Sequence, residues 1–594
     1  MTILQFGEVS AGPPLPAPVA RVCDLVRELA DLHPDSAAVV CGDDTVTYRQ
    51  LTDRARAVAH ALDGDEGPGG SPRIGIRAHR TADTVVHALG IALSGRSFVF
   101  VDAQAPERAL EHVRSSAGVA LVVDPRTGTA HRSRAAGPTA RSAPGGPSLD
   151  DEAYVLYTSG SSGLPKGVSV SQRNLASSTA ARLAVYEPFG TPVFLLLSPF
   201  RFDSSVAGVW GTLAAGGTLV VAREGERRDP QALLALIARH GVTHLLTVPT
   251  FYAELLHALG QIDADRAGAA SLRVAICAGE ALAQSVIDRH FAMLPGVALA
   301  NEYGPTECTV WSTYRMYDRP GRSTIGFPIP GTAVRLLDDR LRPVPAGEVG
   351  QIALSGPGVA AGYVGDPQQT HAKFVTLRNA DGTDARAYLT GDLGRWSDRD
   401  GIEFAGRLDN EVKIRGVRVT IEAMEQAITQ DPGVRAAAVV HDTEASLCTA
   451  FVVLRTEGAA DTASLRGRVA EALGGEVAPD RFRFVDSLPR TAHDKTDRAA
   501  LLESARAARP AAGPTTDGLA TDDLAARIAR AWSEILGIGA DAIGGGDFFT
   551  LGGNSLSVLR LTRALGKIAD RPIGVKDVYH CATVERQVEL LSRP

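Results

Sequence analysis

The sequence has little of several features that mark other classes of protein. Its six cysteines lie far apart and form no C-x-x-C pair, so we expect neither a zinc site nor a disulfide framework. The formal net charge of -7 is small for 594 residues and no long basic run occurs, which argues against nucleic acid as a partner. The first residues show no basic region followed by an apolar region, the pattern of a secretory leader. No apolar run approaches the roughly 18 residues needed to span a membrane. These absences predict a cytoplasmic protein with no nucleic-acid or membrane partner.

The composition that is present, 44% hydrophobic and 22% charged residues, is that of an ordinary folded protein. A single core stops growing near about 300 residues, so a chain of this length is expected to form several domains. From about residue 20 to 505, short β-branched runs alternate with helical stretches, of which 230–240 is the clearest. The runs lie at 37–40, 98–101, 193–197 and 218–221. This alternation predicts α/β layers.

Two segments rich in Ala, Gly, Pro and Ser interrupt the alternation, at 135–147 and 505–518. Such a composition buries little surface and is typical of exposed loops or linkers. The second segment is the better domain boundary, because amphipathic helices and almost no strand signal follow it. These helices are predicted over 524–536, 556–565 and 583–591. We therefore expect a small helical domain of about 75 residues at 519–594.

The string YTSGSSGLPKG at 157–167 combines glycines, hydroxyl residues and one lysine. Glycines let backbone N–H groups face an anion, hydroxyls add donors and Lys166 adds a positive charge, which together indicate a phosphate-binding loop. The alternative is a flexible Gly/Ser linker. A P-loop is disfavoured, because Gly167 rather than Ser or Thr follows the lysine.

With this string and four others in the same order, the chain resembles the adenylation domains of nonribosomal peptide synthetases, which belong to the adenylate-forming superfamily. The other strings are FDSS from residue 202, NEYGPTE from 301, YLTGD from 388 and GRLDNEVKIRG from 406. The resemblance implies an α/β adenylate-forming fold with a large N-terminal core subdomain at 1–408. A small, mobile α+β C-terminal subdomain at 409–504, a linker at 505–518 and an all-α four-helix peptidyl carrier domain at 519–594 would follow.

The resemblance also implies the reaction and its catalytic residues. A substrate carboxylate would attack the α-phosphorus of ATP, so catalysis depends on alignment and charge neutralisation. Lys495 would bridge the substrate carboxylate and ATP, Thr306 would contact the α-phosphate, and Glu307 would help to bind Mg2+. The residues implied in ATP binding are Thr158, Ser159, Gly160, Ser161, Ser162, Gly163, Lys166, Asn301, Tyr303, Asp392 and Arg407.

Four residues of that set are expected around the nucleoside. Tyr303 would stack on adenine with Asn301 near the edge of the base, and Arg407 would contact the ribose. Asp392 would accept hydrogen bonds from both ribose hydroxyls, which suits a group that only accepts. A lone aspartate is usually solvated surface, so this assignment depends on the whole set of motifs.

Two further positions would serve the transfer step. Asp409 resembles the hinge about which the C-terminal subdomain turns between its two catalytic poses. Gly416 would lie beside the incoming pantetheine, where the missing side chain leaves room. The sequence departs from the family around Lys495, where His493 and Asp494 replace the usual Asn-Gly, so that loop is expected to be less rigid.

The helical tail contains DFFTLGGNSL from residue 547, which resembles the attachment signature of carrier proteins. Ser555 would open a helix after a Gly-Gly turn and carry 4'-phosphopantetheine near the positive helix end; the alternative is an ordinary serine N-cap. We find no HHxxxDG or G-x-S-x-G string, so the unit is expected to load a substrate without condensing or releasing it. Expected partners are a phosphopantetheinyl transferase, downstream tailoring or condensation enzymes, and an MbtH-like protein.

By the same resemblance, nine positions would line the substrate pocket. They are Asp203, Ser204, Ala207, Leu246, Ile276, Ala278, Glu302, Val310 and Trp311. Asp203 is assigned to the substrate α-ammonium, which leaves Glu302 as the one ionisable group facing the side chain. A buried carboxylate needs a partner, so L-histidine is the expected substrate, with ornithine, lysine and arginine as alternatives.

Two other functions remain open at this stage. An acyl- or aryl-acid ligase of the same superfamily would share the phosphate loop, but it would need no anion at Asp203. A non-catalytic carrier scaffold is the other, although the nucleotide residues are retained.

Overall fold

The computed structural model describes two compact units, each treated by itself: Met1–Gly160 with Leu164–Asp409, and Ser161–Gly163 with Asn410–Pro594. The described residues are 10–15, 20–66, 73–103, 107–132, 148–158, 165–260, 269–379, 381–408, 411–414, 417–442, 447–456, 460–473, 477–490, 496–507 and 524–536, with shorter pieces between 543 and 592. Within these ranges no helix is both long and apolar enough to cross a membrane. The Ala/Gly/Pro-rich segment at 135–147 lies outside them.

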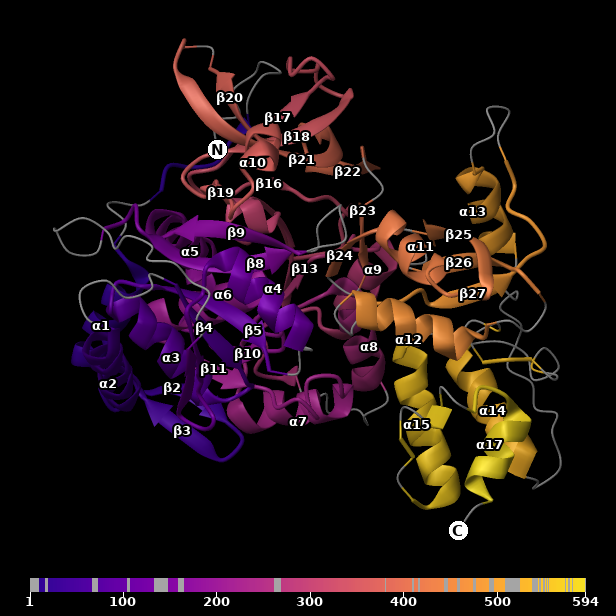
Figure 1. Cartoon of the computed structure of the whole chain (residues 1–594). Helices are drawn as coiled ribbons and strands as arrows, with labels where there is room; N and C mark the ends of the chain where they lie inside the picture. Colours follow the sequence, from indigo (N-terminus) through magenta and orange to yellow (C-terminus); the bar gives the residue numbers. More distant parts are fainter. Residues whose placement is uncertain are drawn as a thin grey trace. The chain divides into compact units, whose positions relative to one another are not determined.

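A nine-stranded sheet forms the centre of the first unit (Figure 1). In order across the sheet its strands are β16 (Phe327–Pro328), β15 (Thr313–Tyr317), β14 (Ala298–Tyr303), β13 (Val274–Ala278), β12 (His244–Thr247), β10 (Val193–Leu196), β11 (Thr218–Val221), β2 (Ala37–Cys41) and β3 (Asp44–Thr47). The strands from β14 to β2 are parallel, and the outer strands pair antiparallel. In parallel sheets of this kind, binding sites form at the carboxyl ends of the strands.

A second sheet of seven strands lies in the same unit. Its order is β19 (Gly362–Tyr363), β9 (Lys166–Ser171), β8 (Glu152–Thr158), β5 (Ser97–Asp102), β4 (Arg73–Ala78), β6 (Leu121–Asp124) and β7 (Thr129–Arg132). Helices α1 (Val22–Leu32), α2 (Tyr48–Glu66), α3 (Ala82–Leu93), α5 (Gln172–Tyr186) and α6 (Asp203–Ala214) share one apolar core with strands of both sheets. Helix α4 (Glu107–Ala117) covers the other face of the seven-stranded sheet.

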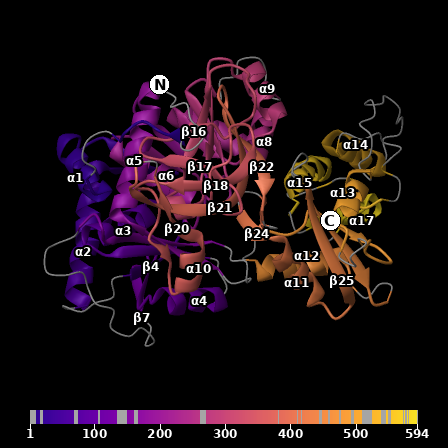
Figure 2. The same ribbon diagram turned by 90° about the horizontal axis from the view of Figure 1, so that it is seen from above.

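The other face of the nine-stranded sheet has its own core, built with α7 (Pro230–His240), α8 (Pro249–Gly260) and α9 (Gln284–Met293). Figure 2 shows α8 and α9 side by side on this unit. Asp229 caps α7 by accepting hydrogen bonds from two backbone N–H groups, and Gly241 ends it in a left-handed conformation. The predicted helix at 230–240 and the four predicted β-runs are thereby confirmed.

A third, antiparallel sheet completes the first unit. It orders β1 (Ser10–Ala11), β17 (Ala333–Leu337), β18 (Val349–Ser355), β21 (Asp384–Ser397) and β20 (Phe374–Arg378), with β22 (Gly401–Arg407) paired to β21. Helix α10 (Pro367–Lys373) leads into β20. Asp392 and Arg407 are paired across β21 and β22, so the sheet itself brings these two predicted nucleotide-binding residues together.

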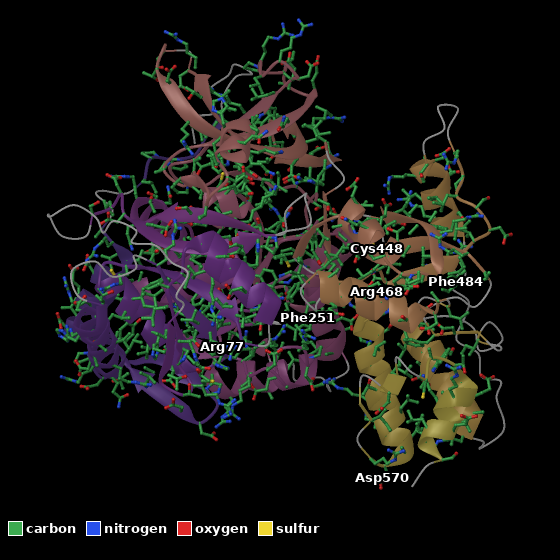
Figure 3. All side chains as sticks on the ribbon, in the orientation of Figure 1. Arg77, Phe251, Cys448, Arg468, Phe484 and Asp570 are labelled. Atoms are coloured by element: carbon green, nitrogen blue, oxygen red, sulfur yellow. The ribbon has the colours of Figure 1, made fainter. Side chains whose placement is uncertain are left out.

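The second unit begins with an α+β subdomain. Its elements are β23 (Glu411–Ile414), β24 (Val417–Thr420), α11 (Ile421–Thr429), β25 (Val434–Asp442), β26 (Leu447–Leu454), α12 (Thr462–Ala472), β27 (Arg481–Phe484) and α13 (Arg498–Ala507). Figure 3 labels Cys448 on β26, which is fully buried, and Arg468 on α12, which lies 3.3 Å from Asp431. Helix α13 continues to Ala507, and Arg506 pairs with Asp442 at 3.0 Å. The linker predicted from residue 505 therefore starts later, because this ion pair and the buried Ala505 keep residues 505–507 in the helix.

The carrier region follows with α14 (Leu524–Leu536), α15 (Ser555–Ala569) and α17 (Val584–Leu591), close to the three predicted helices. Trp532 and Phe548 are fully buried and meet edge to face, 4.9 Å between ring centroids. The indole N–H of Trp532 donates to Gln587 at 2.9 Å. This core orients α15, which starts at Ser555 as predicted.

Candidate active site

The phosphate-loop string connects two paired strands. Thr158 at the end of β8 and Lys166 at the start of β9 are direct partners across the sheet. Ser159, Gly160, Ser161, Ser162 and Gly163 lie outside the described residues. The pairing nevertheless fixes both ends of the loop on one rigid hairpin.

Lys166 and Glu307 approach the same tyrosine from different segments. The ammonium of Lys166 donates to Oε1 of Gln369 on α10 and lies 5.6 Å from the ring centroid of Tyr363. The hydroxyl of Tyr363 donates to Oε1 of Glu307 at 2.7 Å and lies 3.2 Å from the hydroxyl of Tyr388. Burial, and next the charge of Glu307, raise the pKa of Tyr363 far above its ordinary value. Tyr363 therefore stays a donor to a buried carboxylate.

This arrangement suits Mg2+. In the described part of the chain, no group of three or more His, Cys, Asp or Glu side chains lies together as a metal cage. Mg2+ bound with nucleotides takes one or two carboxylates plus phosphate oxygens and water. Glu307, 2% exposed and oriented by Tyr363, fits such a single protein ligand.

A second cluster joins three residues implied in nucleoside binding. The hydroxyl of Tyr303 donates to Oδ2 of Asp392, and the guanidinium of Arg407 donates to Oδ1. Asp392 is buried, and burial together with this carboxylate raises the pKa of Tyr303 well above its ordinary value. The carboxylate of Asp392 thus accepts from one hydroxyl and one guanidinium, and its assignment to the ribose hydroxyls stays a prediction.

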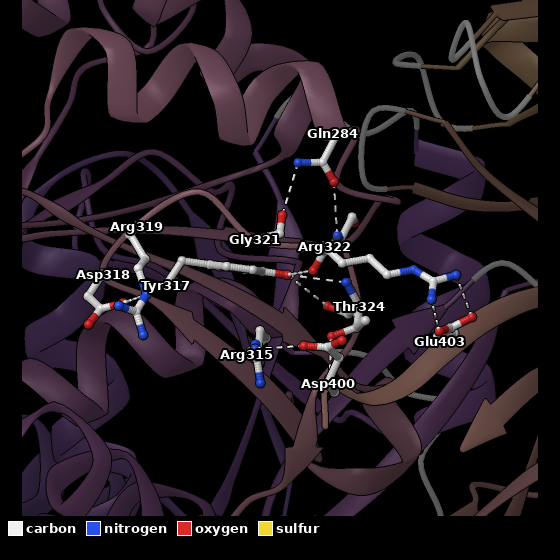
Figure 4. Close-up of polar contacts among 11 residues, drawn as sticks. Gln284, Arg315, Tyr317, Asp318, Arg319, Gly321, Arg322, Thr324, Asp400 and Glu403 are labelled. Atoms are coloured by element: carbon white, nitrogen blue, oxygen red, sulfur yellow. Dashed lines mark hydrogen bonds and ion pairs between the residues drawn. The ribbon is translucent and has the colours of Figure 1, made fainter. Parts of the chain in front are cut away.

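Asn301 has a partner in the protein backbone, and its predicted place near the base stays a prediction. Its amide nitrogen donates to the backbone oxygen of Thr324 at 2.8 Å, and the residue is 3% exposed. Figure 4 shows the hydrogen bonds around the loop after β15. The backbone oxygen of Thr324 also accepts from the hydroxyl of Tyr317, and the hydroxyl of Thr324 donates to the backbone oxygen of Asp400. One N–H of the Asn301 amide is thus bonded to the loop after β15, which orients the side chain.

Asp203 and Thr306 come together although 103 residues separate them. The hydroxyl of Thr306 donates to Oδ2 of Asp203 at 2.6 Å. Asp203 begins α6, and Thr306 begins a short helical turn after β14. The next residue of α6, Ser204, donates to the hydroxyl of Ser198 at 2.9 Å.

The strand-borne pocket residues share one face of the nine-stranded sheet. Leu246 is the register partner of Ile276, and Ala278 is the partner of Glu302. Because side chains alternate along a strand, Ile276 and Ala278 point to the same side. These positions lie at the carboxyl ends of β12, β13 and β14, toward the core that contains α5 and α6.

The remaining wall of the pocket has an unusual backbone. Thr309 and Val310 have φ angles of 57° and 81°, the left-handed region, which a β-branched residue rarely adopts. The hydroxyl of Thr309 donates to the backbone oxygen of Gly358 at 2.7 Å, and its own carbonyl accepts from Ser178 at 2.8 Å. These bonds hold a strained segment next to Trp311, as at many ligand sites.

Glu302 already has partners within the protein. Arg182 of α5 lies 2.8 Å from its Oε2, and the hydroxyl of Tyr186 donates to Oε1 at 2.5 Å. The side chains of Arg182 and Glu302 are 8% and 2% exposed. The expectation that Glu302 is the one ionisable group facing the substrate side chain is therefore wrong, because α5 supplies a buried cation. A charged residue in a helix that otherwise carries only Arg173 was the available signal.

Several predicted residues are outside the described part of the chain, namely Lys495, Asp409 and Gly416. Arg490 and Thr496, which flank the segment of Lys495, form an isolated antiparallel bridge. Ser555 opens α15, and a helix start suits a phosphate group. That position fits the attachment of 4'-phosphopantetheine.

The fold, the phosphate-loop hairpin and the helical tail define an adenylate-forming enzyme joined to a carrier domain. The chain matches the models for AMP-binding enzyme over residues 26–364, AMP-binding enzyme C-terminal domain over 423–495, and phosphopantetheine attachment site over 526–591. The chain belongs to the AMP-binding enzyme family, with adenylation and carrier domains of the nonribosomal peptide synthetase type. Such domains use ATP with Mg2+ and carry 4'-phosphopantetheine, and they activate an amino acid or another acid.

Two relatives and one solved structure illustrate the likeness. The chain is 32% identical over 583 residues to bacitracin synthase 3 of Bacillus licheniformis, covering 94% of this chain and 9% of that protein. It is 32% identical over 582 residues to phosphinothricin tripeptide synthetase PhsC of Streptomyces viridochromogenes, covering 93% and 51%. It therefore spans about half or less of these relatives. The structure of holo-PA1221, an adenylation and carrier protein bound to a vinylsulfonamide inhibitor, matches with a TM-score of 0.76, 28% identity and 96% coverage of both chains.

Proposed function

We propose that the chain activates an amino acid as aminoacyl-AMP and transfers the aminoacyl group as a thioester to its own carrier domain. In the first step a carboxylate oxygen of the amino acid bonds to the α-phosphorus of ATP, and pyrophosphate leaves. 4'-Phosphopantetheine on Ser555 supplies the thiol that accepts the aminoacyl group, and AMP leaves. Natural-product biosynthesis of the nonribosomal type is the setting that the relatives support.

The 2.6 Å contact between Thr306 and Asp203 carries this proposal. The amine and carboxylate of an amino acid are attached to the same carbon. An acceptor for the ammonium must therefore lie close to the group that contacts the α-phosphate. The carboxylate of Asp203 and the hydroxyl of Thr306 lie this close together. Their proximity favours an amino acid as the substrate over the simple carboxylic acid of an acyl- or aryl-acid ligase.

The remaining roles follow the same reaction. Lys166 neutralises charge on the β- and γ-phosphates, the hydroxyls of the phosphate loop donate hydrogen bonds to them, and Glu307 would bind Mg2+. Tyr303, Asp392 and Arg407 hold the nucleoside. Lys495 offsets charge at the attacking carboxylate, and Gly416 admits the pantetheine after the C-terminal subdomain turns about Asp409.

L-Histidine remains the proposed substrate, for a revised reason. Arg182 balances the charge of Glu302, so the pair as a whole is neutral and a cationic side chain gains little. A carboxylate can accept about four hydrogen bonds, and Glu302 accepts two from Arg182 and Tyr186 among the described residues. A neutral imidazole N–H can donate to it while the flat ring packs among Leu246, Ile276 and Trp311.

The proposed partners act before and after loading. A phosphopantetheinyl transferase would modify Ser555, and tailoring or condensation enzymes would receive the tethered amino acid. An MbtH-like protein is a further proposed partner of the adenylation domain.

ATP–pyrophosphate exchange measured with all common amino acids and ornithine tests the proposal. We expect exchange with one amino acid, histidine first, and a fall in histidine exchange for Glu302→Gln. No exchange with any of them contradicts amino-acid activation and leaves an acid ligase or a non-catalytic scaffold. A clear preference for an aliphatic or acidic residue contradicts histidine alone.

Two variants separate the half-reactions. Lys495→Ala should abolish exchange, because the charge at the attacking carboxylate is lost. Ser555→Ala should preserve exchange but prevent phosphopantetheine attachment and loading, read by mass spectrometry. Loading of the Ser555→Ala protein would remove the carrier assignment.

A further inference from the structure

Arg182 is buried against Glu302, one of the nine positions expected to line the substrate pocket, and is not itself among those nine. Its guanidinium carbon lies 4.5 Å from the ring centroid of Trp311 and 5.4 Å from that of Tyr186. Burial lowers the pKa of Arg182, but the charge and hydrogen bonds of Glu302 and Tyr186 outweigh it and raise the pKa overall. The cation is therefore permanent and lies against both aromatic rings, whose own centroids are 6.1 Å apart.

The packing of α6 leaves room for this side chain. A Cβ added at Gly211 of α6 would lie 2.8 Å from Cδ of Arg182. Gly211 follows Ala207 by one helical turn, so it lies on the same face of α6 as that pocket residue. Helix α6 thus packs on the aliphatic stem of Arg182, while Glu302 of β14 and the ring of Trp311 contact its guanidinium.

A buried carboxylate facing a pocket would ordinarily attract a cationic ligand, since an unpaired charge inside a protein is strongly unfavourable. Here Arg182 takes the place that the ammonium of an ornithine or lysine side chain would occupy. We infer that Arg182 is a specificity-determining residue: it sets the charge preference of the pocket by neutralising Glu302, and so selects substrates with uncharged side chains. This inference rests on the proposed function, because it concerns the amino acid that the site activates.

If charge balance sets the preference, substitutions of Arg182 and of Glu302 should shift substrate preference in opposite directions. Arg182→Met keeps the length of the side chain and removes its charge, so the pocket becomes net negative. Glu302→Gln keeps the shape of the carboxylate and leaves Arg182 unbalanced, so the pocket becomes net positive. A merely structural role for the pair would lower exchange with every substrate equally and would not move these preferences in opposite directions.

The experiment measures kcat/KM in ATP–pyrophosphate exchange for the best neutral amino acid, ornithine and glutamate. Close charge pairs have strong coupling, so Arg182→Met should raise the ratio of ornithine to neutral substrate by at least about tenfold. Glu302→Gln should instead raise the ratio of glutamate to neutral substrate, again by at least about tenfold. Arg182→Met/Glu302→Gln should return both ratios toward those of the wild type.

Arg96→Met is the matched control, because Arg96 is also a buried arginine, 2% exposed and 2.8 Å from Asp63, and it directly precedes β5 of the seven-stranded sheet. It should leave both ratios unchanged. If Arg182→Met does not fold, Glu302→Gln carries the same test with the opposite sign.

The outcomes separate the two claims. A wild-type protein that exchanges with no amino acid contradicts the proposed function. A wild-type protein that exchanges, but prefers ornithine or lysine, or whose folded variants keep the wild-type ratios, overturns the role of Arg182 and leaves the proposed function in place.

Discussion

The hydroxyl of Tyr363 donates a 2.7 Å hydrogen bond to the carboxylate of Glu307, and its ring lies beneath the ammonium of Lys166. One side chain therefore contacts both the cation of the phosphate-loop hairpin and the carboxylate expected to bind Mg2+. Neither contact is encoded in a local motif, since 56 residues separate Tyr363 from Glu307. Tyr363 thus positions two groups that we propose to act on ATP, and Tyr363 is not itself expected to contact ATP.

Tyr363→Phe removes that donor while it keeps the ring under Lys166. A buried carboxylate that loses a donor is less favourable, and changes in residues that orient metal ligands reduce metal affinity by about 10- to 100-fold. We expect exchange to need correspondingly more Mg2+, measured by titrating Mg2+ at saturating ATP. Tyr314→Phe is the control, because within the described residues its hydroxyl has no hydrogen bond assigned. An unchanged Mg2+ requirement would contradict this role.

Gly304→Ala tests the strained wall of the pocket. A Cβ there would lie 2.4 Å from Cα of Trp311 and 2.7 Å from the carbonyl oxygen of Val310, both backbone atoms that cannot move cheaply. Overpacking of this kind costs about 1–3 kcal/mol, and the shift would fall on the pocket. We expect a higher KM for the amino acid and a lower unfolding temperature. Gly296→Ala, which would meet no atom within 4 Å, should alter neither.

The parts predicted from the sequence are those encoded locally. The β-branched runs and the helix at 230–240 follow from periodicity and capping, and α15 begins at Ser555, where the sequence predicted a helix start. The pair of Arg182 and Glu302 was not predictable, since 120 residues separate them and the fold alone brings α5 against β14. The same holds for Asn301, whose amide nitrogen is taken by a loop 23 residues later. Motifs indicated the candidate residues, but tertiary packing determined their partners.

His244 should make stability depend on pH. It is 3% exposed, beside the rings of Tyr186 and Phe189, and burial, then the charges of Arg273 and Arg182, lower its pKa to about 4. Its folded pKa lies below the unfolded value of about 6.5, so its contribution is complete above that pH and is lost as pH falls toward 4. The loss amounts to about 3 kcal/mol at most.

His244→Gln removes this titration and checks the prediction. Free energies of unfolding of the two proteins, measured between pH 7.5 and 4.5, should diverge as the pH falls, with the wild type losing more. Other buried histidines, such as His290, remain in both proteins and cancel in the difference. Parallel curves would show that His244 does not titrate as proposed.

Asp409→Pro tests the proposed hinge, which coincides with the division between the two compact units after Asp409. Proline fixes φ near about −65° and so obstructs a change of backbone conformation. We expect loading of the carrier domain to fall much more than exchange. Asp409→Ala keeps the backbone free and should retain loading; equal loss of both half-reactions in the proline variant would argue against a hinge here.

Gly553→Ala tests how the carrier domain presents Ser555. A Cβ at this position would lie 2.3 Å from the ring of Phe548 and 2.6 Å from its carbonyl oxygen. Phe548 is fully buried against Trp532, so the ring cannot move aside and the backbone of Gly553 must shift. The overpacking costs about 1–3 kcal/mol.

We expect slower phosphopantetheine attachment, followed by mass spectrometry with a phosphopantetheinyl transferase, while pyrophosphate exchange is unchanged because the first unit is untouched. Gly467→Ala in α12 is the control, because a Cβ there meets nothing within 4 Å. This variant should acquire phosphopantetheine at the wild-type rate. Normal attachment to the Gly553→Ala protein would mean that the packing of Gly553 on Phe548 does not control the approach to Ser555.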